Sequence, residues 1–254
     1  MVAPDSGGMT GTLTDARQAY ARGDHAAVVS LISALLADRP GDDAAHELRA
    51  RALLALGRTA DAERDAQDAV RLDPDEIRYR ELLAQVLAAE GAHHDAATEY
   101  SRLARNDPRQ RDWALAEAGE RLSAAEGQQA VEAARRAVRL DPADASAQLA
   151  LAQALVRIGD AGALPAALAA ARLASDDARA QEAVADARWL SGDEAAAFNA
   201  LRHLATRLPE TERRRLTDKA RRLYRRRAGW LGRLVAGVPW LFEVALRNGW
   251  LDLR

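Results

Sequence analysis

The chain has 254 residues and contains no cysteine, which excludes disulfide bonds and metal sites built on thiolates. Hydrophobic residues make up 48% of it but aromatic residues only 4%, and Ala, Leu, Arg, Asp and Glu dominate. This composition predicts an all-α protein. The net charge of −2 hides an asymmetry: residues 1–210 carry 24 basic and 34 acidic residues, a net of −10, whereas residues 211–254 carry 12 and 4, a net of +8. We therefore expect an acidic body with a basic end.

The first residues have none of the features of a secretory signal. Residues 1–9 contain Pro4, Gly7 and Gly8 but neither a charged start nor an apolar run, so we expect a disordered lead-in and a cytoplasmic protein. Lys219 is the only lysine, and this use of Arg for nearly every cation is typical of a GC-rich bacterial genome.

From about Thr10 the chain repeats a pattern of two apolar-periodic segments with a glycine between them. Glycine closes a helix because it adopts a left-handed backbone without steric cost, and proline cannot continue the helix that precedes it. The turn glycines are Gly23, Gly57, Gly91, Gly127, Gly159 and Gly192, and the seams, the residues that end each pair, are Pro40, Pro74, Pro108, Pro142, Asp176 and Pro209. Each seam follows its glycine at the same spacing, except that Pro142 comes two positions early after Gly127. A repeat period of about 34 residues predicts stacked helix pairs.

Small residues, Ala62, Ala96 and Ala197, follow three of the glycines by five positions and allow two helices to approach closely. With the Gly turn and the terminal Asp-Pro, this pattern resembles the tetratricopeptide repeat family over about residues 9–210, as six repeats. The resemblance implies an all-α, right-handed solenoid over residues 10–210, closed by a basic capping helix at 211–227. It also implies a non-catalytic scaffold that presents a groove to a protein or peptide partner. Gly162 and Pro165 make the fifth repeat less regular.

The resemblance places the groove on the first helix of each pair. The residues ten before each turn glycine are Leu13, Glu47, Glu81, Glu117, Leu149 and Glu182, and those six before are Arg17, Arg51, Gln85, Arg121, Gln153 and Asp186. Glu–Arg pairs four residues apart on one helix contribute about 0.2–0.5 kcal/mol each. These positions are therefore either a solvated, salt-bridged face or a polar ligand groove. The family's clamp for a C-terminal carboxylate uses Asn and Lys, which none of these positions holds.

The end of the chain departs from the repeat. Residues 211–227 form an Arg-rich helix with Leu216, Ala220, Leu223 and Tyr224 on one face, and 228–254 is a Trp-rich apolar tail. Its longest uncharged apolar run, 234–242, has nine residues, too few to span a bilayer. The candidate contact residues are Arg221, Arg222, Arg225, Arg226, Trp230, Leu234, Trp240, Phe242 and Trp250. Three alternatives stay open: the tail caps the last repeat or joins a homodimer, it docks on the inner face of a membrane, or it binds another protein. Nucleic acid is a weaker alternative because the body is acidic.

Motifs of catalysis and cofactor binding are absent from the sequence. There is no glycine-rich phosphate loop, and His46-Glu47 lacks the second histidine of a zinc-protease helix because position 50 is Ala50. We interpret His25, His93 and His94 as solvated turn residues. We expect no enzyme activity, no metal and no cofactor.

Overall fold

The computed structural model describes residues 7–227, 237 and 242, and all regular secondary structure in them is α-helical, as the composition predicts. The helices are α1 (Gly7–Ala21), α2 (His25–Asp38), α3 (Asp43–Ala55), α4 (Thr59–Leu72), α5 (Ile77–Glu90), α6 (His93–Asn106), α7 (Arg111–Ser123), α8 (Gly127–Leu140), α9 (Ala145–Ile158), α10 (Ala163–Leu173), α11 (Ala178–Leu190), α12 (Glu194–Arg207) and α13 (Glu210–Arg227). Helix α1 begins at Gly7, inside the segment expected to be a lead-in. In the described part of the chain, no helix has both the length and the apolar character needed to cross a bilayer.

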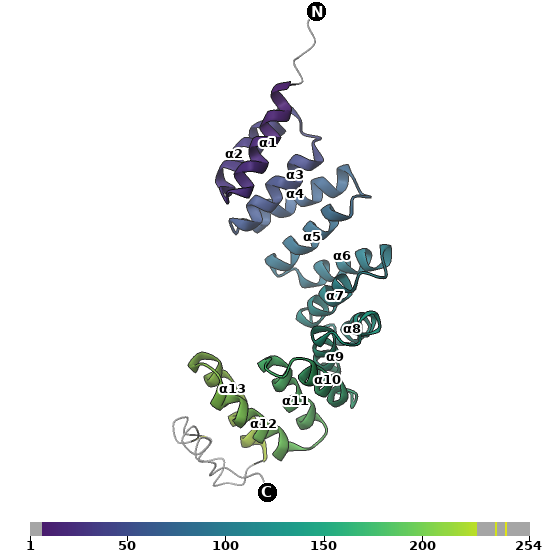
Figure 1. Cartoon of the computed structure of the whole chain (residues 1–254), viewed down its shortest axis with the longest axis vertical. Coiled ribbons are helices and arrows are strands. Elements are labelled where there is room, and N and C mark those ends of the chain that lie inside the picture. The colour runs from purple at the N-terminus through teal and green to yellow at the C-terminus, as the bar shows by residue number, and fades with distance from the viewer. Residues whose placement is uncertain (1–6, 228–236, 238–241, 243–254) are drawn as a thin grey trace, which may run out of the picture. The chain divides into compact units, whose positions relative to one another are not determined.

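The chain forms two compact units, an N-terminal unit (Met1–Ala125, with α1–α7) and a C-terminal unit (Glu126–Arg254, with α8–α13). Within each unit every helix packs on the next along the chain, as the cartoon shows (Figure 1). The first helices of successive pairs also touch, α1 with α3 and α3 with α5 in the N-terminal unit, and α9 with α11 in the C-terminal unit. Each unit therefore contains a row of neighbouring first helices.

Aspartates before the helices explain why several of them begin where they do. The backbone N–H of Ala27 donates to Asp24 Oδ1 at 3.0 Å, and the N–H of Ala45 donates to Asp42 Oδ1 at 2.9 Å. Such a side chain satisfies one of the amide groups that a helix start leaves unpaired. Asp144, Asp177 and Asp193 cap α9, α11 and α12 in similar ways.

The turns within the pairs confirm the role of glycine at five of the six predicted places. Gly23, Gly57, Gly91, Gly159 and Gly192 all have φ between 72° and 85°. The fourth turn differs, because the left-handed residue there is Ala125, with φ 63°. Ala125 precedes Pro142 at the spacing that separates Gly23 from Pro40, so the repeat is regular once the turn is placed correctly.

Gly127 was therefore misassigned as a turn residue. It is the first residue of α8 and is buried. A Cβ at this position would lie 2.6 Å from Cγ2 of Ile158 on α9. Gly127 is needed for close packing of two helices and not for a left-handed backbone.

The cores of the two units rely on small side chains at the helix contacts. Ala62, Ala96 and Ala197, the predicted contact positions, are fully buried. The core of the N-terminal unit includes Val28, Ile32, Leu82 and Val86, and that of the C-terminal unit includes Phe198, Leu201, Leu216 and Tyr224. Burial of Leu216, Ala220 and Tyr224 confirms the predicted apolar face of α13 at those three positions.

Candidate functional site

The residue with a left-handed backbone in each turn is a common reference position from which equivalent positions on the first helices are counted. Counting from Ala125 instead of Gly127, the equivalent positions in the fourth pair are Leu115 and Gly119, so Glu117 and Arg121 do not belong to the series. The structure agrees, because Glu117 is buried, with 4% of its surface exposed. We call the series ten residues before each turn residue the first column and the series six residues before it the second column. The first column is Leu13, Glu47, Glu81, Leu115, Leu149 and Glu182; the second is Arg17, Arg51, Gln85, Gly119, Gln153 and Asp186.

In the N-terminal unit the second column reaches solvent. Arg17, Gln85 and Gly119 are exposed, and a Cβ at Gly119 would meet no atom within 4 Å. In the first column Glu47 is half-buried and accepts a hydrogen bond from Nε of Arg51 at 2.9 Å. Glu81 is also half-buried, but the residue four positions later is Gln85, which carries no charge. The columns of this unit therefore combine one internal ion pair with one acid that lacks such a partner.

In the C-terminal unit the last acids of the columns are occupied by the chain itself. Glu182 accepts from Arg215 Nη2 and from Lys219 Nζ, both at 2.6 Å, and Lys219 also reaches Asp186 at 2.7 Å. Arg215 follows Glu182 by 33 residues in the sequence, and Lys219 follows Asp186 by the same number. This is about one repeat period, so α13 continues both columns, with cations at the positions where α11 has acids. Gln153 is exposed on α9, whereas Leu149 is buried.

The charges around α13 shift the pKa values of the two acids in opposite directions. Burial disfavours ionised Glu182, but hydrogen bonds from Arg215 and Lys219 outweigh it and lower its pKa. For Asp186 burial is the stronger effect and raises its pKa, although Lys219 opposes it. Glu182 is thus the stronger anchor for α13 at neutral pH.

A buried polar cluster lies at the first seam, where the sequence did not indicate one. His46 Nδ1 lies 2.9 Å from Asp65 Oδ1, and His46 Nε2 lies 3.0 Å from the carbonyl oxygen of Pro40. Arg49 donates to both oxygens of Asp65, at 2.6 and 2.7 Å, and these hydrogen bonds raise the pKa of Arg49. The cluster ties the seam and α3 to α4.

The same cluster contains the described group that comes nearest to a metal site. His46, Asp65 and Asp68 place potential ligand atoms within 4.8 Å of one another. The ligand atoms of His46 and Asp65 are already engaged, and the guanidinium of Arg49 faces the carboxylate that a metal would need. The residues present therefore do not fit a metal ion.

The seam contact recurs in other repeats with matched residue types. Arg80, one repeat period after His46, donates to the Pro74 carbonyl at 3.4 Å and to Glu99 at 2.8 Å. Gln148 and Gln181 donate to the carbonyls of Pro142 and Ser175 at 3.1 and 3.2 Å. The residues 19 positions after His46, Arg80, Gln148 and Gln181 are Asp65, Glu99, Ala167 and Ala200. An imidazole or guanidinium group at the donor position is matched with an acid and an amide donor with alanine, so this position serves the fold.

A pocket of about 330 Å³ lies between α2, α3 and α4. The charged side chains that line it are Arg49, Arg58, Arg64, Asp61, Asp65 and Asp68. Their charges balance, and Arg58 and Arg64 both pair with Asp61, at 2.6 and 3.2 Å. The pocket therefore offers a ligand no excess of either charge.

Comparison with known proteins identifies the repeat. Residues 13–77 and 48–111 match the model of the tetratricopeptide repeat family. A tetratricopeptide repeat protein from Parabacteroides merdae ATCC 43184 superposes with a TM-score of 0.70 over 92% of this chain and 98% of that chain, at 14% identity. Residues 13–111 belong to the tetratricopeptide repeat family, and the chain has the fold of that family.

Other solved structures share the tetratricopeptide repeat fold of this chain over shorter spans. The MamA protein aligns with a TM-score of 0.61 and 16% identity, covering 67% of this chain and 94% of that chain. MamA residues 41 to the end from Desulfovibrio magneticus RS-1 align with a TM-score of 0.59 and 16% identity, covering 66% and 93%. At such identities the likeness shows the fold alone. No curated protein gives a significant match.

The side chains of His25 and His93, interpreted from the sequence as solvated turn residues, make contacts within the N-terminal unit. His93 Nδ1 lies 2.8 Å from Glu120 Oε2 on α7, so His93 pairs with a neighbouring helix instead of being merely solvated. The His25 ring packs edge-on against Tyr20, with centroids 5.1 Å apart. His94 is exposed. No feature of the sequence indicated the first two contacts, because their partners belong to other helices.

Of the tail candidates, Arg222 and Arg225 are exposed on α13, and Arg221 pairs with Asp218 at 2.9 Å. Phe242 is fully buried, and its ring lies 5.7 Å from that of Tyr224, which lies 5.6 Å from that of Phe198. At Phe242 the structure thus favours the alternative in which the tail caps the last repeat. Trp230, Leu234, Trp240, Trp250 and the side chain of Arg226 lie outside the described residues.

Proposed function

We propose that this tetratricopeptide repeat protein is a non-catalytic scaffold that binds a protein or peptide along the columns of its N-terminal unit. One observation carries the proposal. The columns there present exposed Arg17, Gln85 and Gly119, whereas the last acids of the C-terminal unit are bound by α13. Of the described column residues in the C-terminal unit only Gln153 is exposed, so the N-terminal unit offers a partner more free column positions.

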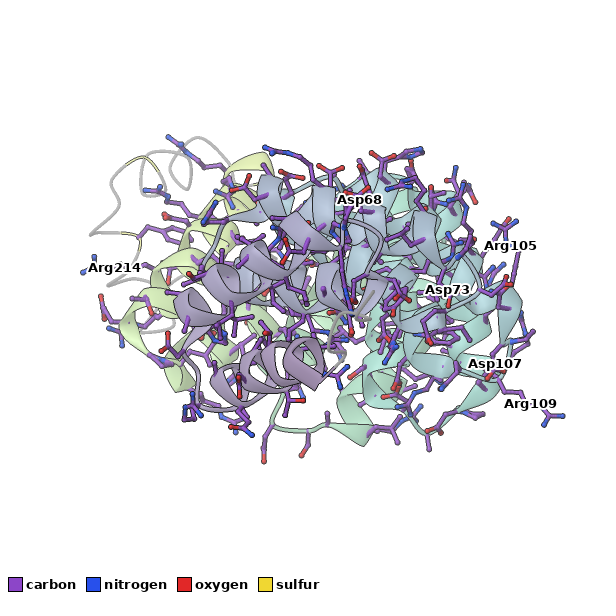
Figure 2. All side chains as sticks on the ribbon, turned by 90° about the horizontal axis from the view of Figure 1, so that it is seen from above. Asp68, Asp73, Arg105, Asp107, Arg109 and Arg214 are labelled. Carbon is purple, nitrogen blue, oxygen red and sulfur yellow. The ribbon has the colours of Figure 1, made fainter. Side chains whose placement is uncertain are left out.

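The residues that these columns expose suit a polar ligand. Gln85 offers both a donor and an acceptor for a peptide backbone. Gly119 leaves room for close approach, since a Cβ at this position would meet no atom within 4 Å. Charged residues next to the third seam point into solvent. In Figure 2 Arg105 and Arg109, which flank Pro108 in the sequence, project outward from the ribbon.

Burial of Phe242 is the reason for preferring the scaffold to the membrane alternative. A membrane anchor needs its large apolar side chains free to enter the lipid interface, and Phe242 is packed against Tyr224. Arg222 and Arg225 alone would supply only electrostatic attraction, about 1 kcal/mol for each cation.

The test is site-specific photo-crosslinking of the full chain in its source cells. A photoreactive residue at Gln85 is expected to trap a partner, and one at Gln67, which is exposed on the second helix α4, is expected not to. Equal trapping at both positions, or trapping at Gln67 alone, would overturn the proposal.

A further inference from the structure

The second helices of the C-terminal unit carry arginines that the described part of the protein does not neutralise. Helices α8, α10 and α12 contain six arginines and only two acids, Glu132 and Glu194. Five of the six arginines form no side-chain hydrogen bond or ion pair with any residue that the structure describes. They are Arg135, Arg139, Arg172, Arg202 and Arg207. This excess of unpaired cations is available to a negatively charged partner.

Two of these helices, α8 and α10, can be aligned residue by residue. Gln148 and Gln181 each donate to the carbonyl oxygen six residues before them, so the repeat that follows Pro142 ends at Ser175, one residue before the expected Asp176. Counting 33 residues, the distance from Pro142 to Ser175, leads from α8 to α10 and gives three equivalent pairs. They are Arg135 and Leu168, Arg139 and Arg172, and Leu140 and Leu173.

These six side chains lie at equivalent places on two helices that both pack against α9. The three leucines are 37–46% exposed, and the three arginines are exposed as well. Helix α10 contains no acid, and the only acid of α8 is Glu132. We call the six residues the Arg-Leu patch. It presents cations and large apolar side chains to solvent together.

The equivalent positions of the N-terminal unit lack this combination. On α4, Arg71 pairs with Asp68 at 2.8 Å, and the leucine that follows it, Leu72, is half-buried. On α6, Arg105 donates to a backbone carbonyl at 3.2 Å and is followed by Asn106. The repeat fold therefore requires neither the unpaired arginines nor the exposed leucines of the Arg-Leu patch.

The groups that the patch presents decide the kind of partner. A guanidinium group binds a carboxylate through a pair of hydrogen bonds, and an exposed leucine gains free energy when an apolar side chain covers it. Nucleic acid would satisfy only the arginines, through its phosphates. A lipid interface requires side chains that penetrate it, whereas more than half of the surface of each leucine is already covered by the protein. A protein segment with both acidic and apolar side chains satisfies the whole patch.

Segments of this chain match the patch less well. Residues 228–254 are apolar but contain three arginines against two acids, so they lack the carboxylates. A second copy would have to offer acids from its own surface, and Asp61, Asp68 and Glu99 on the second helices of the N-terminal unit already pair with arginines. The observations therefore favour a different protein as the partner.

We propose that the Arg-Leu patch binds an acidic, amphipathic segment of a partner protein. The carboxylates of the segment pair with the arginines of the patch, and its apolar side chains cover the leucines. This inference goes beyond the proposed function, because the patch lies on second helices whereas the columns lie on first helices. The chain thereby gains a second binding surface, in the unit whose column acids α13 already occupies.

The experiment uses the full chain and a designed fluorescent peptide of about 18 residues, with Leu along one helical face and Glu on both flanks. Binding is measured by fluorescence anisotropy. Arg139→Gln with Arg172→Gln is expected to weaken binding about fivefold or more, as for the loss of two exposed charge pairs. Leu140→Ala with Leu173→Ala is expected to weaken it by a similar factor, because less apolar surface is buried in the complex. All four side chains are exposed, so the variants keep their helices, which circular dichroism checks.

The matched control is Arg71→Gln with Arg105→Gln, which removes the same charge from the equivalent exposed positions of α4 and α6. It is expected to leave the affinity for the peptide unchanged. Equal weakening by the control would show that the peptide is attracted to any arginine and would overturn the inference. Absence of peptide binding would overturn it too, as would weakening by the arginine variant without any effect of the leucine variant.

The other occupants are tested with the same variants. Co-sedimentation with phosphatidylserine vesicles and a gel shift with double-stranded DNA are measured for wild type and for both patch variants. If vesicle or DNA binding depends on the patch and peptide binding does not, the partner class is wrong. Self-association that both patch variants abolish, measured by analytical ultracentrifugation, would make a second copy the occupant, with the same consequence. Cross-linking at Gln85 reports on the columns alone, so failure of either proposal leaves the other testable.

Discussion

His46 and Asp65, 19 residues apart, form a buried pair in which Nδ1 and Oδ1 are separated by 2.9 Å, and Arg80 and Glu99 repeat that pair one period later. Where the donor is Gln148 or Gln181, the partner position holds alanine. The matching has a physical reason, since a buried acid needs hydrogen-bond donors beside it, whereas an amide donor is satisfied by the carbonyl of the seam.

The first prediction follows from this matching. His46→Ala is expected to lower the free energy of unfolding by about 2 kcal/mol or more, because it leaves a buried carboxylate and a seam carbonyl with fewer partners. The double change His46→Gln with Asp65→Ala reproduces Gln148 and Ala167 and should cost less than the two single changes together. The free energy of unfolding of each variant is compared with that of wild type by urea denaturation, with the helical signal as the probe. Strictly additive losses would show that the two residues do not act as a pair.

Ala125 is the basis of the second prediction. A non-glycine residue in the left-handed region costs about 1 kcal/mol, so Ala125→Gly should raise the stability by up to that amount. Gly91→Ala, at φ 85°, is the converse change and should lower it. Thermal denaturation of the two variants measures both changes in stability. If Ala125→Gly instead lowered the stability, a residue other than Ala125 would have the left-handed backbone in the fourth turn.

A third prediction concerns the pH dependence of the contact between α13 and α11. The hydrogen bonds of Arg215 and Lys219 hold the pKa of Glu182 below its ordinary value of 4.5 against the opposing effect of burial. A lowered folded pKa contributes stability above the unfolded pKa, and this stability is lost as the pH falls through the folded pKa. Glu182→Gln should therefore lower the melting temperature near neutral pH, with the difference from wild type shrinking below pH 4.5.

Asp186→Asn is the matched comparison, since burial raises the pKa of Asp186 and the sign is reversed. Ionised Asp186 costs stability above its folded pKa, and that cost is relieved as the pH falls toward 3.8, its ordinary value. For each variant the difference in melting temperature from wild type is plotted against pH from neutral to acid. The two plots should have slopes of opposite sign. Parallel slopes would contradict the assigned roles.

The fourth prediction separates a capping tail from a membrane anchor. Phe242 is fully buried beside Tyr224, so Phe242→Ala should lower the free energy of unfolding by about 3–5 kcal/mol. Binding to anionic vesicles, measured by co-sedimentation, should not depend on this side chain as long as the protein is folded. Unchanged stability together with a loss of vesicle binding would instead support the membrane alternative.

Local features of the sequence were enough to predict the helices. A residue that adopts a left-handed backbone and a proline that cannot continue a helix act on their immediate neighbours, so Gly57 and Pro74 end their helices whatever surrounds them. The repeat period and the family followed from those positions. The same reasoning failed at Gly127, because the left-handed backbone of Ala125 is imposed by its surroundings and not by its own preference.

Only the tertiary structure decided which charges meet. Glu182 and Arg215 are 33 residues apart, and their pairing depends on how α13 is placed beside α11. Glu81 has the same spacing as Glu47 and Glu182, yet only the packed helices show that Glu47 and Glu182 form ion pairs and that Glu81 forms none with a described residue. Periodicity along the chain reveals which residues are equivalent, whereas the partners of each residue depend on contacts between helices that are distant in sequence.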